Sequence, residues 1–170
     1  MTYTPNADFF GTDTFKYTVT TANNSETTDV AVDVRSVIDA VIDVKPGGDP
    51  NSINLGSNGV LPIGVYTTST ADGEVDDFDA STLLTDTIKL NGIDVDPVHA
   101  ALEDLDGDGD LDLILHFRTR DLVDGGILYE ESVDLALTAE YDGGNALGND
   151  LQGSDSVRVV PPKGKGKSGK

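Results

Sequence analysis

The chain has 170 residues, of which 37% are apolar, enough for one hydrophobic core and little more than one complete domain. Its 31 acidic residues outnumber 11 basic ones, and the resulting net charge of −20 repels nucleic acid and anionic membrane surfaces but attracts divalent cations. The absence of cysteine excludes disulfides and sulfur-ligated metal sites, and no apolar run approaches the roughly 18 residues that membrane insertion requires.

The first expected elements are two strands that form a hairpin. Residues 13–20 (DTFKYTVT) place Phe15, Tyr17 and Val19 at alternate positions, the two-residue period of a half-buried strand. After a turn-rich stretch, residues 27–34 (TTDVAVDV) alternate valines with polar residues in the same way. The pattern therefore predicts an antiparallel pair.

The run YTPNADFFGTDTFKYTVTTANNSETTDVAVDV, residues 3–34, resembles the closing third of bacterial immunoglobulin-like or cadherin-like tandem repeats of large secreted proteins. The resemblance implies an incomplete repeat over residues 1–36, a partial Ig-like hairpin, because a whole immunoglobulin-like sandwich needs about 100 residues. A lone hairpin is marginally stable in water. We therefore expect it to pack on the following module, on upstream sequence, or on another copy of the chain through self-association.

Residues 37–162 are predicted to form the main module, a β-sandwich of mostly antiparallel strands. Short apolar runs indicate strands near 38–45, 60–67, 87–95, 111–118, 132–140 and 155–160. Asp-Gly and Asn-Gly pairs between these runs supply the positive-φ residues that tight turns require. We expect an all-β fold with one short helical turn over 79–84, capped by Asp79.

Two further stretches are expected to lie outside the strands. Residues 45–59 form a long polar loop, in which Asp49, Asn51 and Asn54 could complete a metal shell, form a second site, or simply make turns. Residues 163–170 (KGKGKSGK) are predicted to be a disordered, solvated tail.

The most specific motif is the acidic stretch EDLDGDGDLDL, residues 103–113. Numbered from Asp104, carboxylates fall at positions 1, 3, 5, 7 and 9 and a glycine falls at position 6, which is the spacing of a calcium loop. Leu111 at position 8 is expected to anchor the loop to the core. An EF-hand is excluded because position 12 is Leu115 instead of glutamate, and because residues 111–118 have the alternation of a strand.

This loop, feeding directly into a strand, resembles the calcium loops of FG-GAP and related propeller repeats, and more loosely those of dockerins and thrombospondin type 3 repeats. The resemblance implies Asp104, Asp106, Asp108 and Asp112 as side-chain ligands and Asp110 as a backbone ligand. We add Glu103 as a spare ligand. Crowded carboxylates repel one another, and an ion held by six to eight oxygens removes that repulsion. Hard oxygen donors favour Ca²⁺, although a solvated acidic turn is the alternative.

Catalysis has little support, so we expect a protein that is not an enzyme. No GxSxG motif or comparable nucleophile frame is present. His99 and His116 are too few for a His-rich zinc site and are predicted to be strand residues with local hydrogen bonds.

Residues 38–162 resemble a module that recurs in multidomain secreted bacterial proteins, most specifically in VKPGGDPNSIN and LDLILHFRT. The N-terminus lacks the features of a signal peptide, so we expect a secreted form to be part of a longer chain. We predict a calcium-binding, non-catalytic structural or adhesive module of a secreted or cell-surface bacterial protein.

The alternative is a carbohydrate-binding accessory module that recognises a polysaccharide or cell-surface glycan. Sugar platforms usually need exposed aromatic faces, and the chain has no tryptophan. The candidates are Tyr66, Tyr129 and Tyr141, each of which could instead pack within the strands.

Overall fold

The computed structural model describes residues 2–6, 9–74, 76–143 and 149–160 and confirms the all-β fold. The strands are β1 (Gly11–Thr20), β2 (Ser25–Val34), β3 (Val37–Asp39), β4 (Ile42–Val44), β5 (Ser52–Asn54), β6 (Val60–Val65), β7 (Leu83–Leu90), β8 (Ile93–Asp94), β9 (His99–Glu103), β10 (Asp112–Arg118), β11 (Asp134–Tyr141), β12 (Asn149–Ser156) and β13 (Arg158–Val160). Two 3₁₀ turns, η1 (Thr70–Asp72) and η2 (Ala80–Thr82), and one α-helix, α1 (Thr119–Asp124), complete these elements.

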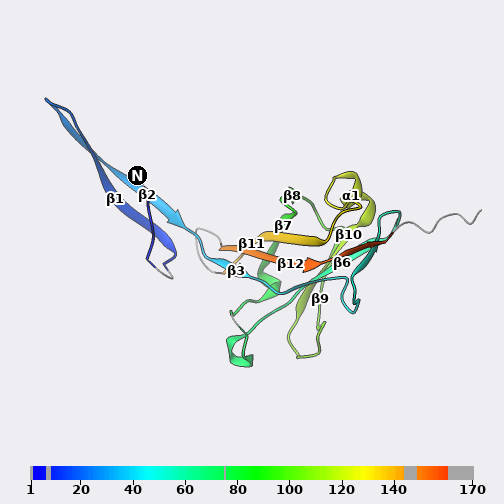
Figure 1. Cartoon of the computed structure of the whole chain (residues 1–170). Helices are drawn as coiled ribbons and strands as arrows, with labels where there is room; N and C mark the ends of the chain where they lie inside the picture. The colour runs from blue at the N-terminus through cyan, green and yellow to red at the C-terminus, as the bar shows by residue number, and fades with distance from the viewer. Residues whose placement is uncertain (1, 7–8, 75, 144–148, 161–170) are drawn as a thin grey trace, which may run out of the picture.

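Two sheets form the body of the molecule (Figure 1). One has four strands in the order β4-β6-β10-β9, and the other has five in the order β3-β12-β11-β7-β8. Apolar side chains from both sheets belong to one buried cluster, as expected of a β-sandwich. The short parallel pair β5–β13 adds a further edge.

The core follows from the two-residue period of the strands. In β10, Leu113, Leu115 and Phe117 are buried, while the intervening side chains lie on the other face of the sheet. In β11, Leu135 and Leu137 do the same from the opposite sheet. Alternate burial on both sides therefore produces a single apolar layer between the sheets.

The single strand predicted over 38–45 is in fact two strands in different sheets. β3 pairs with β12 in a parallel direction, whereas β4 pairs with β6 in the other sheet. The chain changes sheets beside Gly153, where a Cβ atom would lie only 2.6 Å from the carbonyl oxygen of Ala40. The absence of a side chain at Gly153 lets the connecting backbone pass.

Other differences from the predicted strands have local causes. The strand expected over 87–95 is displaced to β7, and Asn91, with a φ of 48°, turns the chain into the two-residue β8. β12 and β9 are additional strands that lack a clear apolar alternation. The predicted cap is confirmed, because the Asp79 carboxylate accepts a hydrogen bond of 2.9 Å from the Ser81 amide.

The predicted hairpin is confirmed as β1 and β2, paired from Gly11 opposite Val34 to Thr20 opposite Ser25. It projects from the body in Figure 1, and neither strand has a further strand partner among the described residues. At its base, Arg35 makes ion pairs of 2.9 Å with Glu140 and Asp150 of the body. The unpaired strand edges are those that the predicted self-association would use. The predicted tail at 163–170 lies outside the described residues.

Replacing Gly153 by alanine is expected to lower the free energy of unfolding by about 1–3 kcal/mol, the usual cost of overpacking. The new methyl group would meet Ala40 backbone, which cannot move aside without displacing the crossing between sheets. Chemical denaturation measures the change. Ser154→Ala, at the exposed next position of β12, is the matched control and should stay within about 0.5 kcal/mol. Equal stability of the two variants would contradict this account of the crossing.

Candidate metal site

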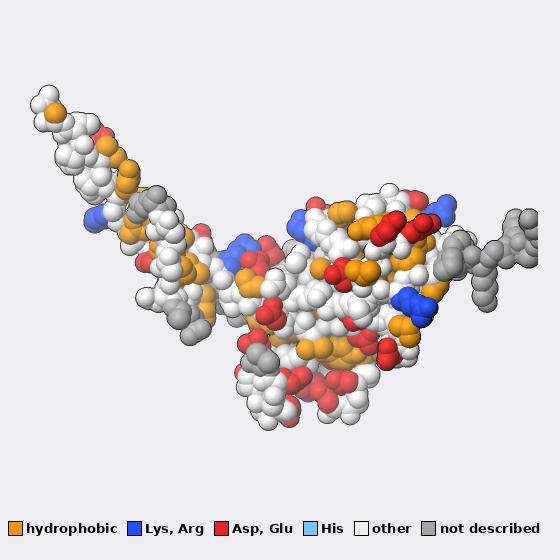
Figure 2. Space-filling model, in the orientation of Figure 1, with side chains coloured by type: hydrophobic (Ala, Val, Ile, Leu, Met, Phe, Trp, Pro, Cys, Tyr) orange, Lys and Arg blue, Asp and Glu red, His pale blue; other side chains and the backbone are white. Residues whose placement is uncertain are grey.

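The acidic loop, residues 104–111, joins β9 to β10 at the end where Glu103 lies opposite Asp112. Figure 2 shows acidic side chains gathered at the lower end of the body, where this loop and the loop containing η1 lie in Figure 1. Gly107 and Gly109 have φ values of 86° and 104°, which a residue with a side chain rarely adopts. The glycines therefore allow the tight path that brings the aspartates together.

Three of the five predicted ligands come together. One carboxylate oxygen from each of Asp104, Asp106 and Asp108 lies within 4.8 Å of the others, and all three residues are exposed. These three carboxylates could hold a metal ion.

Backbone N–H groups of the loop hold each of these carboxylates in place. The Asp104 carboxylate accepts a hydrogen bond of 2.7 Å from the Gly107 amide, and the Asp106 carboxylate accepts one of 3.2 Å from the Asp108 amide. The Asp108 carboxylate accepts one of 2.8 Å from the Asp110 amide. Each bond uses one carboxylate oxygen, so the second oxygen of each aspartate stays available to a cation.

Asp112 occupies a different place from the other predicted ligands. Its side chain is 1% exposed, and its two oxygens accept hydrogen bonds from the Thr67 amide at 2.9 Å and the Leu105 amide at 2.8 Å. Burial raises the pKa of this carboxyl, the two amide donors oppose that rise, and the charges of Asp106 and Asp108 add to it. Asp112 therefore fastens the acidic loop to the segment that follows β6, at Thr67, and lies outside the group of three.

Asp110 and Glu103 also lie outside that group. Glu103 is an exposed residue at the end of β9, and the Asp110 side chain lines a neighbouring cleft. The sequence predicts that Asp110 binds the ion through its backbone carbonyl. The position of its side chain does not bear on that prediction.

The residue that anchors the loop is Leu105, and the prediction for Leu111 is wrong. Leu111 is 54% exposed. Leu105 is half-buried over Gly64, where a Cβ atom would lie 2.9 Å from its methyl carbon and 3.2 Å from Pro46. Leu105 occupies position 2 of the loop. It is a single apolar residue among repeated aspartates, so no periodic pattern in the sequence marks it as an anchor.

Tyr66, which the sequence offers as a possible sugar-binding ring, has its phenol beside this negative charge. Burial and the carboxylates of Asp43, Asp112 and Asp106 raise the pKa of Tyr66 to about 12. The Tyr66 hydroxyl lies 3.5 Å from Asp43, whose own pKa is raised by burial and by Asp155. The negative potential therefore extends from the loop to β4.

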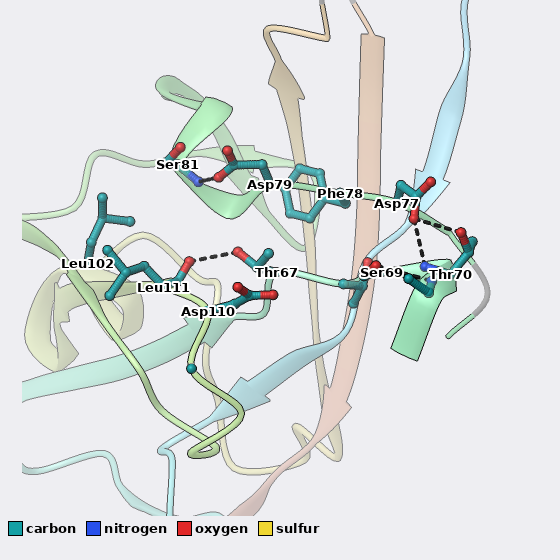
Figure 3. A pocket seen from close by; sticks show the side chains of 13 residues that line it. Thr67, Ser69, Thr70, Asp77, Phe78, Asp79, Ser81, Leu102, Asp110 and Leu111 are labelled. Carbon is teal, nitrogen blue, oxygen red and sulfur yellow. Dashed lines mark hydrogen bonds between the residues drawn. The ribbon is translucent and has the colours of Figure 1, made fainter. Parts of the chain in front are cut away.

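An open cleft of about 880 Å³ adjoins the acidic loop, and Figure 3 shows its walls. The Thr67 hydroxyl donates a hydrogen bond of 2.7 Å to the Leu111 carbonyl and joins the two sides at one point. Across the cleft, Asp77 accepts hydrogen bonds from both the amide and the hydroxyl of Thr70, which lower its pKa. The lining of the cleft therefore combines hydroxyl and carboxylate groups with the apolar side chains of Phe78, Leu102 and Leu111.

The three tyrosines proposed as a sugar platform differ in how deeply they are buried. Tyr141 is a core residue whose ring meets that of Phe78 edge to face at 5.4 Å. Tyr66 is half-buried, whereas Tyr129 is exposed. Tyr141 thus serves strand packing and offers no open face to a ligand.

The stretch 45–59, predicted as a loop, contains the three-residue strand β5, which pairs with β13, and both Asn51 and Asn54 make hydrogen bonds. Asn54 accepts a hydrogen bond of 2.9 Å from the Gly56 amide within the loop. The Asn51 amide donates to Asp155 at 2.7 Å and to the Ser156 carbonyl at 3.0 Å, tying the loop to the end of β12. Asp49 precedes a cis peptide bond to Pro50.

Comparison with known proteins gives no family. No protein-family model matches the chain, and no curated protein matches it. Among solved structures, a chain from a study of host cell surface retention of a 1.5-MDa bacterial ice-binding adhesin matches with a TM-score of 0.39 and 15% identity. That match covers 89% of this chain and 43% of the other, so this chain spans less than half of that chain's length. The resemblances to cadherin-like repeats and FG-GAP loops stay predictions.

In the part of the chain that the structure describes, no helix has the length and apolar character needed to span a membrane.

Asp112→Ala is expected to lower the free energy of unfolding by about 2–4 kcal/mol, because two part-buried amides would lose a charged acceptor. Denaturant unfolding with a metal chelator present would measure this change without a contribution from bound ions. Asp110→Ala removes a neighbouring exposed carboxylate and should change stability by less than about 0.5 kcal/mol. A similar effect of both substitutions would show that loop charge, and not the hydrogen bonds of Asp112, sets stability.

Proposed function

We propose that this chain is a calcium-binding, non-catalytic structural or adhesive module of a larger secreted or cell-surface bacterial protein. The observation that best supports this function is the approach of Asp104, Asp106 and Asp108 carboxylate oxygens to within 4.8 Å of one another. The ion would have a structural role, because the loop that would hold it connects two neighbouring strands of one sheet.

The chemistry of the donor set favours calcium. Carboxylate and carbonyl oxygens are the ligands of Ca²⁺, which accepts six to eight of them in flexible geometry. Mg²⁺ requires a tighter octahedron and keeps several waters, and transition metals prefer imidazole or thiolate. The Asp110 carbonyl and solvent would supply further oxygens beside the three carboxylates.

A bound ion would act on stability through the acidic loop. Asp112 and Leu105 hold the loop on the body, whereas the three exposed carboxylates of Asp104, Asp106 and Asp108 repel one another. An ion replaces that repulsion with attraction and binds the native state, where the carboxylates are gathered. Calcium would therefore stiffen the junction of β9 and β10, as a structural module in an extracellular protein requires.

Calcium at about 100 times its dissociation constant is expected to raise the melting temperature by roughly 5–10 °C, since such binding contributes about 2.7 kcal/mol. Asp106→Ala should weaken calcium binding by about tenfold or more in isothermal titration. Asp110→Ala keeps its backbone carbonyl and should bind calcium almost normally. Unchanged melting with calcium and with chelator would refute the proposal.

The alternative of a carbohydrate-binding module has one observation in its favour, the cleft beside the acidic loop, whose lining includes five hydroxyl side chains. A neutral polyol could exchange hydrogen bonds with this lining, whereas an acidic sugar would be repelled by Asp77, Asp79 and Asp110. Retention of the full chain on immobilised neutral polysaccharides is expected to rise with calcium if this alternative holds. Identical elution with calcium and with chelator on every polysaccharide would remove it.

A further inference from the structure

β9 and β10 bring together the two histidines of this chain. His99 lies directly opposite His116 in the antiparallel register, and their ring centroids are 5.6 Å apart with planes inclined at 37°. Directly opposite residues project from the same face of a sheet. Because Leu115 and Phe117 of β10 enter the core, His116 and His99 lie on the face turned away from it.

One of the two rings has an unsatisfied nitrogen. His116 is half-buried, and its Nδ1 atom is buried without a hydrogen-bond partner among the described residues. The prediction of local hydrogen bonds is therefore wrong at this atom. A buried polar atom without a partner destabilises the fold, and coordination of a cation would remove that cost.

The spacing of the rings suits a shared cation. Two nitrogens bound to one tetrahedral ion at about 2.0–2.1 Å lie roughly 3.4 Å apart. A ring nitrogen stands little more than an ångström from its centroid, so rings with centroids 5.6 Å apart can bring two nitrogens to that separation. His99 is exposed and free to rotate into the required orientation, and exposed side chains change rotamer rapidly.

We propose that His99 and His116 form a chelate site for a first-row transition-metal dication such as Zn²⁺, with solvent completing the coordination shell. Imidazole is a preferred ligand of zinc, nickel and copper but not of calcium, so this site differs in chemistry from the acidic loop. It stands independently of the proposed calcium function. The net charge of −20 lowers the electrostatic cost of bringing a dication to this face.

A metal ion at this site would hold the edge strand β9 against β10. In the strand order β4-β6-β10-β9, β9 has β10 as its neighbour in that sheet and no second partner there. The Val98 amide already donates a hydrogen bond of 2.8 Å to the His116 carbonyl at this end of the pair. A metal ion across the two rings would add a side-chain link at the same point, opposite the end where the acidic loop begins.

Zinc chloride titrated calorimetrically into the full chain, with calcium in excess to occupy the acidic loop, tests the site. We expect one zinc ion per chain, and a loss of zinc affinity of about tenfold or more in His99→Gln and in His116→Gln. Asp106→Ala is the matched control and should bind zinc as the parent chain does. Zinc binding that is absent, or that falls in Asp106→Ala but not in His99→Gln, would overturn the proposal.

Nuclear magnetic resonance of the imidazole nitrogens gives a second readout that does not depend on a variant. Zinc at this site should shift the ring-nitrogen resonances of both histidines together and with the same midpoint. Resonances of either ring that stay unchanged at saturating zinc would also overturn the proposal.

Discussion

The buried carboxylate of Asp112 is the contact on which the arrangement of the candidate metal site depends. It accepts hydrogen bonds from the Leu105 amide, within the loop, and from the Thr67 amide, 45 positions earlier in the chain. These two bonds hold the acidic loop on the body at Leu105 and at its junction with β10, beside the three gathered carboxylates of Asp104, Asp106 and Asp108. A carboxylate buried at this position is tolerated because both of its oxygens are satisfied by amide donors.

The β9–β10 pair places two kinds of metal ligand at its opposite ends. Crowded oxygen donors lie at the end of the pair where Glu103 faces Asp112. Two imidazoles lie at the other end, where His99 faces His116. Oxygen clusters and imidazoles select different cations because calcium is a hard ion and zinc is a borderline one. One antiparallel register thus sets the geometry of both proposed sites.

The remainder of the body provides a rigid support for this pair. β10 lies between β6 and β9 and contributes leucines and a phenylalanine to the core, so the loop leads into a well-packed strand. The crossing beside Gly153 connects the two sheets, and Arg35 bonds the hairpin to Glu140 and Asp150. Exposed ion pairs of this kind contribute little energy, so the hairpin owes its form chiefly to its own strand pairing.

Local patterns in the sequence determined the all-β class, the hairpin, β10, the capped turn at Asp79 and the crowding of aspartates around two glycines. Each follows from neighbouring residues, because strand alternation and turn chemistry act within a few positions of the chain. Tertiary structure alone decided that the Asp112 carboxylate lies outside the group of three, that Leu105 and not Leu111 anchors the loop, and that residues 37–44 divide between two sheets. It also brought His99 against His116. These outcomes depend on residues distant in the chain, such as Thr67, Gly64 and Gly153. No periodic pattern in the sequence indicates which residues these will contact.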